Sequence, residues 1–326
     1  MAKLQILIVE DELIVAEDLR LTLTNLGHEV IAIASSGELA IEISKSKSPD
    51  LILMDIQLAG KIDGITTAEK IHANQDIPVI YVTAYADETL MQRVKQTTPS
   101  GYIIKPFNDR EVYTSIEIGL FRHSVAKEIK KRDAILFALG FGVEWFLRQF
   151  SENHHIELID GKQKAPEGLL TIFENLGIAM GLERIAMFRI SETSLDKYAL
   201  TLTDEWLAHN ALPLKGNPAV TGLDLGRIGM YPRYFEVSQG MSVTLTIADF
   251  ANEDKEFFKG YNFSSIAVLP IRVQDSLYGL LFFIDRSERT WSDEEIEAMK
   301  ISANIIGSVI GLTKDRLGKG KSTRGR

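Results

Sequence analysis

Residues 5–12 read QILIVEDE, an apolar run that leads directly into three acidic residues. An apolar run without polar alternation is typical of a strand that is buried on both faces of a sheet. Similar runs follow at residues 30–34, 51–54, 79–82 and 102–104. Helical patterns separate or follow these runs, at residues 12–26, 37–47, 64–74, 87–97 and 109–122. This alternation predicts an α/β domain with a doubly wound, five-stranded parallel sheet and helices on both faces.

Composition excludes several classes of protein. The chain has 326 residues, a net charge of −9 and no cysteine. The lack of cysteine excludes disulfides, thiolate zinc sites, thiol nucleophiles and cofactors attached through a thioether. An acidic chain also lacks the basic surface that specific nucleic-acid binding needs. No run approaches the ~18 apolar residues of a membrane span, and acids end the first apolar run too early for a signal peptide, so we expect a cytoplasmic protein.

Acidic and phosphate-binding residue types follow the predicted strands of the first domain. Ligands of doubly wound sheets bind outside the carboxyl ends of the strands. The residues at those ends are Glu10, Asp11 and Glu12 after the first strand, Asp55 after the third, Thr83 and Ala84 after the fourth, and Lys105 and Pro106 after the fifth. Each has an ordinary explanation alone, as a helix start, a turn or a solvated loop residue. Their convergence on one edge favours a site.

The chemistry of such a cluster is specific. Clustered carboxylates repel one another unless a cation lies among them, and Mg²⁺ prefers oxygen ligands. A carboxylate can also attack a phosphoryl group and form an aspartyl phosphate. That reaction needs charge neutralisation on the phosphoryl oxygens, which a metal, the Lys105 ammonium and the Thr83 hydroxyl can supply.

Residues 3–122 resemble the receiver domain of two-component response regulators. The matching stretches are ILIVEDE (6–12), LILMDIQLAG (51–60), IDG (62–64), IPVIYVTAYAD (77–87) and SGYIIKPF (100–107). The resemblance implies a sensor histidine kinase as partner and Asp55 as the phosphoacceptor. It implies that Mg²⁺ is bound by the side chains of Asp11 and Asp55, by the Gln57 backbone carbonyl and, mostly through water, by Glu10, which stands in place of the commoner Asp. It further implies phosphoryl-contacting or switch residues at Thr83, Ala84, Tyr102, Lys105 and Pro106, with a cis bond before Pro106.

Residues 123–150 form one long helical pattern. Its second half carries apolar residues at heptad spacing: Leu136, Leu139, Val143, Phe146 and Phe150. Such spacing is typical of a seam between two helices. Two heptads are too few to decide between a homodimer seam and a helix packed on its own domain, so both alternatives stay open.

Residues 151–313 have a different organisation. A helical pattern at 167–180 precedes strand-like runs at 184–190, 198–206, 241–248, 265–273 and 277–285. A Gly/Pro-rich stretch fills 211–240, a short helix is expected at 252–260, and Ser292 with Glu295 forms a capping box that begins a helix over 292–313. Consecutive strands between two helices predict an α+β domain with an antiparallel sheet. Residues 314–326 are basic and glycine-rich, and we expect a disordered tail.

This second region resembles a GAF domain. The stretches that carry the resemblance are GLERIAMFRI (181–190), TDEW (203–206), SIAVLPIRVQDSLYGLLFFID (265–285) and RTWSDEEIEAMKISANIIG (289–307). The resemblance implies a domain that senses a small ligand or dimerises. Candidate pocket residues are Trp206, Tyr231, Tyr234 and Phe235, for which ordinary core packing is the alternative.

The sequence therefore predicts a response regulator in four parts: a receiver domain (1–122), a helical linker (123–150), a GAF-like domain (151–313) and a basic tail (314–326). Asp55 would accept a phosphoryl group with Mg²⁺, and the GAF-like domain would respond as a homodimer. No kinase, cyclase or phosphohydrolase motif is found, so we expect no separate catalytic output. The acidic charge balance also leads us to expect no specific DNA binding. The alternative is a receiver-like scaffold that is never phosphorylated, whose GAF-like domain binds a small ligand.

Overall fold

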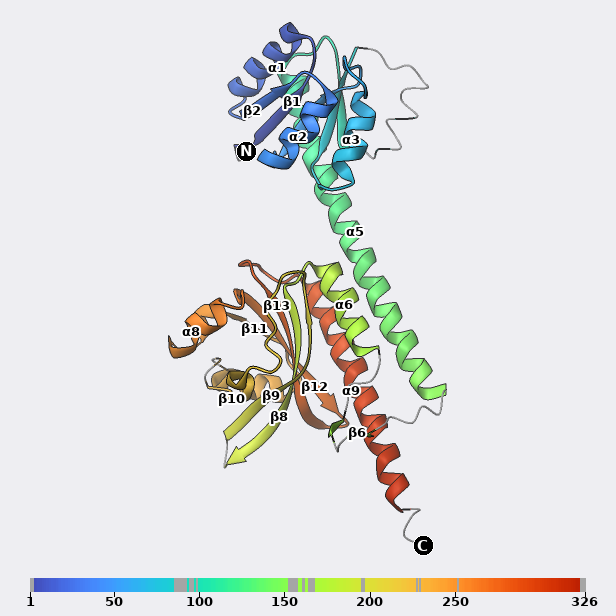
Figure 1. Cartoon of the computed structure of the whole chain (residues 1–326), viewed down its shortest axis with the longest axis vertical. Helices are drawn as coiled ribbons and strands as arrows, with labels where there is room; N and C mark the ends of the chain where they lie inside the picture. Colours follow the sequence, from blue (N-terminus) through green and yellow to red (C-terminus); the bar gives the residue numbers. More distant parts are fainter. Residues whose placement is uncertain are drawn as a thin grey trace. The chain divides into compact units, whose positions relative to one another are not determined.

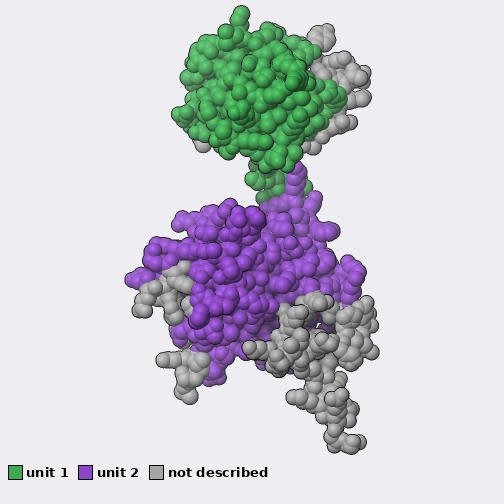
Figure 2. Space-filling view, in the orientation of Figure 1, with its two compact units in different colours: residues 1–129 green, residues 130–326 purple. Residues whose placement is uncertain are grey.

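The computed structural model describes residues 3–84, 93, 97, 99–151, 158–159, 162–163, 168–194, 197–226, 228, 230–250 and 252–322. Two compact units make up the chain, Met1–Ile129 and Lys130–Arg326 (Figure 2). Within the described residues, no helix has both the length and the apolarity to cross a membrane.

The N-terminal unit is built on a five-stranded sheet in the order β2-β1-β3-β4-β5, and every neighbouring pair is parallel. The strands are β1 (Gln5–Val9), β2 (Glu29–Ala34), β3 (Leu51–Asp55), β4 (Val79–Thr83) and β5 (Gly101–Ile104). The helices are α1 (Leu13–Asn25), α2 (Gly37–Lys47), α3 (Gly64–His72) and the first part of α5 (Asp109–Ser151). The predicted doubly wound parallel sheet is confirmed. The helix expected over 87–97 lies almost entirely outside the described residues.

Burial of both sheet faces explains the unbroken apolar runs. In β1, Ile6 and Ile8 belong to one core, while Leu7 and Val9 belong to the core on the other face. All four side chains are at most 1% exposed. Alternate side chains of a strand point to opposite faces, so a strand covered on both sides must be apolar throughout.

The C-terminal unit contains a six-stranded antiparallel sheet in the order β10-β9-β8-β13-β12-β11. Its strands are β8 (Arg184–Ser194), β9 (Lys197–Leu207), β10 (Thr221–Asp224), β11 (Val243–Thr246), β12 (Ser265–Val273) and β13 (Ser276–Asp285). A separate two-stranded ribbon joins β6 (Leu158–Ile159) to β7 (Lys162–Gln163). The predicted antiparallel sheet is confirmed. The Gly/Pro-rich stretch 211–240 contains β10 and several short helical turns.

Long helices cover one face of this sheet, and loops with short helices cover the other (Figure 1). The helix-side core lies under α6 (Leu169–Met180), α9 (Asp293–Ser322) and the second half of α5, and it includes Phe173, Met299 and Phe283. The loop-side core lies under α7 (Tyr234–Ser238), α8 (Asn252–Lys259) and the 3-10 turns Pro218–Val220, Tyr231–Arg233 and Ile247–Asp249. Capping by Ser292 and Glu295 at the start of α9 is present, as predicted.

The second half of α5 packs on its own unit through a face that the heptad pattern marks only in part. Ile135, Ala138 and Trp145 belong to the helix-side core, and a Cβ on Gly142 would lie 3.5 Å from Ile305 and 3.7 Å from Ile172. The residues of the predicted seam do not share one environment. Leu136 and Val143 are 57% and 43% exposed, Leu139 and Phe146 pack partly against the core, and the side chain of Phe150 is outside the described residues. The small residues Ala138 and Gly142 allow α5 to lie close to the helix-side core. A pattern of bulky apolar residues does not reveal such positions.

A substitution at Gly140 tests whether this part of α5 is helical and faces solvent. It is exposed, and a Cβ built on it would meet nothing within 4 Å. Gly140→Ala should therefore raise the free energy of unfolding of the C-terminal unit by about 0.5–1 kcal/mol through helix propensity. The chain's three tryptophans, Trp145, Trp206 and Trp291, all lie in this unit, so urea unfolding followed by their fluorescence isolates it. An unchanged or lower stability would contradict a helical, solvent-facing Gly140.

Candidate functional site

Three carboxyl groups meet at the carboxyl edge of the parallel sheet. Glu10 and Asp11 follow β1, Asp55 ends β3, and one oxygen from each lies within 4.8 Å of the others. β1 and β3 are neighbours in the sheet, so their ends come together. Glu10 and Asp55 are 2% and 6% exposed, whereas Asp11 is exposed. The cluster thus has a buried floor and one open side.

Lys105 is the cation of this cluster. Its Nζ lies 2.7 Å from Glu10 Oε2 and 2.8 Å from Asp55 Oδ2, and its side chain is 15% exposed. The Lys105 N–H donates to the Thr83 carbonyl at 2.8 Å, and the bond to Pro106 is cis, as the resemblance implied. Burial alone would lower the pKa of Lys105, but its hydrogen bonds to Asp55 and Glu10 raise that pKa above its ordinary value. Lys105 is therefore a firmly charged group held against Asp55.

The loop after β3 folds around the acids. The Gln57 backbone N–H donates to Asp55 Oδ1 at 3.2 Å, and the Ala59 backbone N–H donates to Asp11 Oδ2 at 3.2 Å. The Gln57 side chain is exposed. The resemblance implies the Gln57 backbone carbonyl as a Mg²⁺ ligand. The backbone N–H of the same residue holds it beside Asp55.

The other predicted residues lie on β4 and β5. Thr83 ends β4 and is 4% exposed, and β4 lies beside β3, so Thr83 stands at the same edge as Asp55. Ala84 follows it and is exposed. Tyr102 on β5 is 51% exposed, which leaves its ring at the surface.

Gly64 is a residue of this site to which sequence reasoning assigned no role. A Cβ on Gly64 would lie 1.9 Å from the backbone oxygen of Asp55, and the Gly64 N–H donates to the Ile56 carbonyl at 2.9 Å. Asp63 caps α3 by accepting the Thr66 N–H at 2.8 Å. The first turn of α3 is therefore pressed against the end of β3. The Asp-Gly pair at a helix start was the signal in the sequence.

The donors of the cluster fit a divalent cation. All three side chains offer carboxylate oxygens, which are ligands that Mg²⁺ accepts. Among the described residues at the cluster, one ammonium faces three carboxyl groups, so negative charge remains to be balanced. The open side at Asp11 gives a cation access.

The predicted GAF pocket residues do not come together. Trp206 packs against the helix-side core, where a Cβ on Gly177 would lie 2.0 Å from its ring. Tyr234 packs against the loop-side core and stacks on Tyr198 with ring centroids 4.4 Å apart. Phe235 is 70% exposed. The side chain of Tyr231 lies outside the described residues.

A β-bulge in β9 explains the place of Trp206. Met187 of β8 pairs with Asp204, but Phe188 pairs with Leu202, so Thr203 is an extra residue in β9. One extra residue reverses the alternation of side chains between the two faces. Leu202 therefore packs on the loop-side core, whereas Trp206 faces the helices.

Arg184 is a second feature that sequence reasoning missed. It is fully buried, with Nη1 2.9 Å from Glu205 Oε2 and Nη2 2.6 Å from the Leu212 carbonyl oxygen. Glu205 also accepts the Leu214 and Lys215 backbone N–H groups. The pair holds the segment after β9 against the sheet, a structural task that explains the burial of both charges.

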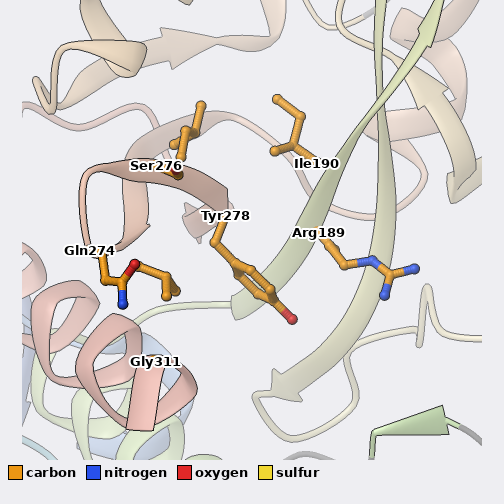
Figure 3. A pocket seen from close by; sticks show the side chains of 8 residues that line it. Arg189, Ile190, Gln274, Ser276, Tyr278 and Gly311 are labelled. Atoms are coloured by element: carbon orange, nitrogen blue, oxygen red, sulfur yellow. The ribbon is translucent and has the colours of Figure 1, made fainter. Parts of the chain in front are cut away.

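An open cleft of about 390 Å³ lies where β8, the β12–β13 turn and α9 meet (Figure 3). Its walls include Arg189, Gln274, Tyr278 and Gly311. The predicted pocket residues Trp206, Tyr234 and Phe235 are not among its described lining residues. The cleft is therefore a different place from the predicted pocket.

Comparisons with known proteins cover both units. A family model for the response regulator receiver domain matches residues 6–117, and a model for the GAF domain matches residues 167–310. The transcriptional regulatory protein PdtaR of Mycobacterium tuberculosis is 30% identical over 36% of this chain and 57% of its own length. The phyllosphere-induced regulator PhyR of Methylorubrum extorquens is 37% identical over 40% of this chain and 48% of its own length.

The matches with these relatives cover only part of each protein. The chain spans about half the length of the curated relatives it matches. Among solved structures, a signal receiver domain of a modulated diguanylate cyclase from Desulfovibrio desulfuricans is 34% identical with a TM-score of 0.37, covering 38% of this chain and 98% of that one. The parallel sheet lies in the N-terminal unit and the antiparallel sheet in the C-terminal unit, as the two family models require. The chain therefore combines an N-terminal response regulator receiver domain with a C-terminal GAF domain.

Proposed function

We propose that this chain is a phosphorylated response regulator in which Asp55 accepts a phosphoryl group from a sensor histidine kinase. The observation that carries the proposal is the setting of Asp55, a buried carboxylate with Lys105 Nζ at 2.8 Å and two further carboxyl groups within 4.8 Å. Lys105 supplies positive charge where a transferred phosphoryl group would place negative charge. Without such a role, this cluster would only destabilise the fold, because buried carboxylates that lie close together repel one another.

In the proposed reaction an Asp55 carboxylate oxygen attacks the phosphorus of a phosphohistidine on the kinase. The new P–O bond forms as the P–N bond breaks, the bonding electrons leave with the imidazole, and the product is an acyl phosphate. Lys105 Nζ contacts the phosphoryl oxygens, and the Thr83 hydroxyl, at the same sheet edge, becomes a hydrogen-bond donor to them. Mg²⁺ would be held by Glu10, Asp11, Asp55 and the Gln57 carbonyl, and it would neutralise charge on the phosphoryl oxygens.

The proposed division of labour follows the chain. Residues 1–122 would be the phosphoacceptor domain, 123–150 the helical linker and 151–313 the sensory or dimerising domain. The disordered tail expected at 314–326 is not what the structure has up to Ser322, where α9 continues, because the helical hydrogen-bond ladder extends past the apolar pattern. We propose that the output is a change in the GAF domain rather than catalysis. Exposed apolar residues of α5, Leu136, Val143 and Leu147, support a homodimer as the assembly in which this output acts.

Intact-protein mass spectrometry tests the phosphoacceptor proposal. The chain is incubated with Mg²⁺ and a small phosphodonor such as acetyl phosphate, and we expect one phosphoryl adduct that requires Mg²⁺. A folded chain without an adduct would overturn the proposal. The acid cluster would then be a metal site or scaffold, and the GAF domain would be the functional half.

Glu10 should make Mg²⁺ binding depend on pH. Burial raises the pKa of Glu10 to about 7, against the hydrogen bond from Lys105 and with the help of the Asp55 charge. A carboxyl group must lose its proton before it can hold a cation. Mg²⁺ affinity in calorimetric titrations should therefore rise about tenfold between about pH 6 and about pH 8. In Glu10→Gln the affinity should be lower and nearly flat over this range, and an unchanged pH dependence would contradict the assignment.

A further inference from the structure

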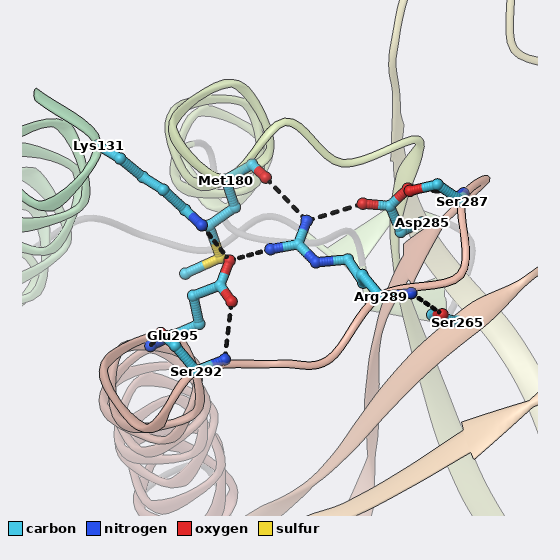
Figure 4. A network of polar contacts seen from close by, with 8 residues as sticks. All are labelled: Lys131, Met180, Ser265, Asp285, Ser287, Arg289, Ser292 and Glu295. Carbon is cyan, nitrogen blue, oxygen red and sulfur yellow. Dashed lines mark hydrogen bonds and ion pairs between the residues drawn. The ribbon is translucent and has the colours of Figure 1, made fainter. Parts of the chain in front are cut away.

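Glu295, at the start of α9, is the centre of a buried ionic network (Figure 4). Its side chain is 2% exposed, and its carboxylate accepts the Ser292 backbone N–H at 3.0 Å and an N–H of Arg289. It also forms an ion pair with Lys131 of α5, with Nζ to Oε1 at 2.9 Å. The carboxylate thus has three partners, one on α5 and two in the loop before α9.

Arg289 extends the network to the rest of the GAF domain. Its Nη1 lies 2.7 Å from Asp285 Oδ2 at the end of β13 and 3.1 Å from the Met180 carbonyl oxygen at the end of α6. Its guanidinium also lies over the Trp291 ring, 4.5 Å from the centroid. The sheet, α6 and α9 are therefore fixed to one another without any contribution from Lys131.

Lys131 stands where α5 enters the C-terminal unit. That unit begins at Lys130. One row of residues that face it along α5 is spaced by four, three, four and three: Lys131, Ile135, Ala138, Gly142 and Trp145. Lys131 is the first of this series and 28% exposed, whereas the others make apolar contacts. The ion pair thus lies at the N-terminal end of the packed face of α5.

The Lys131–Glu295 contact can open at modest cost. If Lys131 leaves, Glu295 keeps Arg289 and the Ser292 N–H, so no buried charge is left unpaired, which is the usual penalty for breaking such a pair. The Lys131 ammonium, already partly exposed, returns to water. The pair is half-buried, with Lys131 28% and Glu295 2% exposed, so its loss should have a measurable effect without leaving the Glu295 charge unpaired.

We propose that the Lys131–Glu295 ion pair is a releasable fastening of α5 to the GAF domain, closed in the unphosphorylated protein and opened by phosphorylation. This inference rests on the proposed function, since it takes Asp55 as the phosphoacceptor. α5 is the element that the two units share, because Val112 and Ile116 lie in the core of the N-terminal unit while Ile135 and Trp145 lie in the helix-side core. Two ion pairs mark the ends of the proposed route, Asp55 with Lys105 in the N-terminal unit and Lys131 with Glu295 in the C-terminal unit.

Amide hydrogen exchange of the full chain tests the fastening. Peptides spanning 131–145 and 292–300 are followed in the wild type, in Lys131→Met and in Lys130→Met, the exposed neighbour that serves as control. Lys131→Met should exchange about fivefold faster over both peptides, whereas Lys130→Met should match the wild type. Beryllium fluoride with Mg²⁺ should accelerate the wild type similarly and add nothing in Lys131→Met. Lys131→Arg keeps the charge and should restore wild-type exchange.

The outcomes separate this inference from the proposed function. Protection of residues 51–60 by beryllium fluoride with no change over 131–145 would overturn the fastening and leave the phosphoacceptor intact. Equal exchange in Lys131→Met and Lys130→Met would also overturn it. If beryllium fluoride protects nothing at 51–60 and no phosphoryl adduct forms, the proposed function fails, and the phosphorylation-controlled release fails with it.

Discussion

Asp55→Asn should abolish the phosphoryl adduct that the wild-type chain forms with a small phosphodonor and Mg²⁺. An amide has no anionic oxygen to attack phosphorus, and it cannot form an acyl phosphate. The substitution should leave the fold intact, because an Asn carbonyl can still accept the Gln57 N–H and Lys105 keeps Glu10 at 2.7 Å. We therefore expect loss of the adduct to below detection in a folded chain, measured as intact mass.

Asp50→Asn is the matched control for this experiment. Asp50 is exposed and lies before β3, where its Oδ2 accepts the Gln5 N–H at 2.7 Å, a role that an amide oxygen can fill. It should form the adduct at the wild-type rate. An adduct that persists in Asp55→Asn would place the phosphoacceptor elsewhere, with the exposed Asp11 as the first residue to examine, and would refute the role proposed for Asp55.

The acid cluster was predictable because a parallel sheet fixes where its strand ends lie. Once the apolar runs ending at Val9 and Met54 are taken as neighbouring buried strands, the acids that follow them must meet at one edge. The distances, the burial of Glu10 and the pairing of Lys105 with two carboxylates then follow from side-chain packing, which a strand pattern does not contain. The roles proposed for these residues stay predictions until phosphorylation is measured.

The second unit was harder to predict at the level of side chains. A single bulge at Thr203 turns Trp206 to the opposite face from Leu202, and no residue type announces a bulge in advance. Of the residues in the heptad pattern of α5, Leu139 and Phe146 pack partly against the core while Leu136 and Val143 are exposed, and the most buried positions are instead Ile135, Ala138 and Trp145. Hydrophobic patterns find the faces of an element, but the size of the gap between elements decides which face is used.

Gly64→Ala should destabilise the N-terminal unit and impair phosphoryl transfer together. The added Cβ would lie 1.9 Å from the backbone oxygen of Asp55, so either α3 or the end of β3 must move. Backbone atoms cannot step aside as a flexible side chain can, and overpacking of this kind costs about 2–3 kcal/mol. We expect hydrogen exchange of β3 amides to accelerate accordingly, and the adduct to form at least tenfold more slowly.

Gly101→Ala separates this effect from a general intolerance of alanine. Gly101 begins β5, and a Cβ there would meet its nearest atoms at 3.7 Å, an ordinary contact. It should leave both the exchange of β3 and the rate of phosphorylation close to wild type. If Gly64→Ala lost stability but transferred the phosphoryl group at the normal rate, the position of α3 would matter for folding alone. Joint loss, with Gly101→Ala unaffected, would show that the contact between α3 and the Asp55 backbone positions the phosphoacceptor.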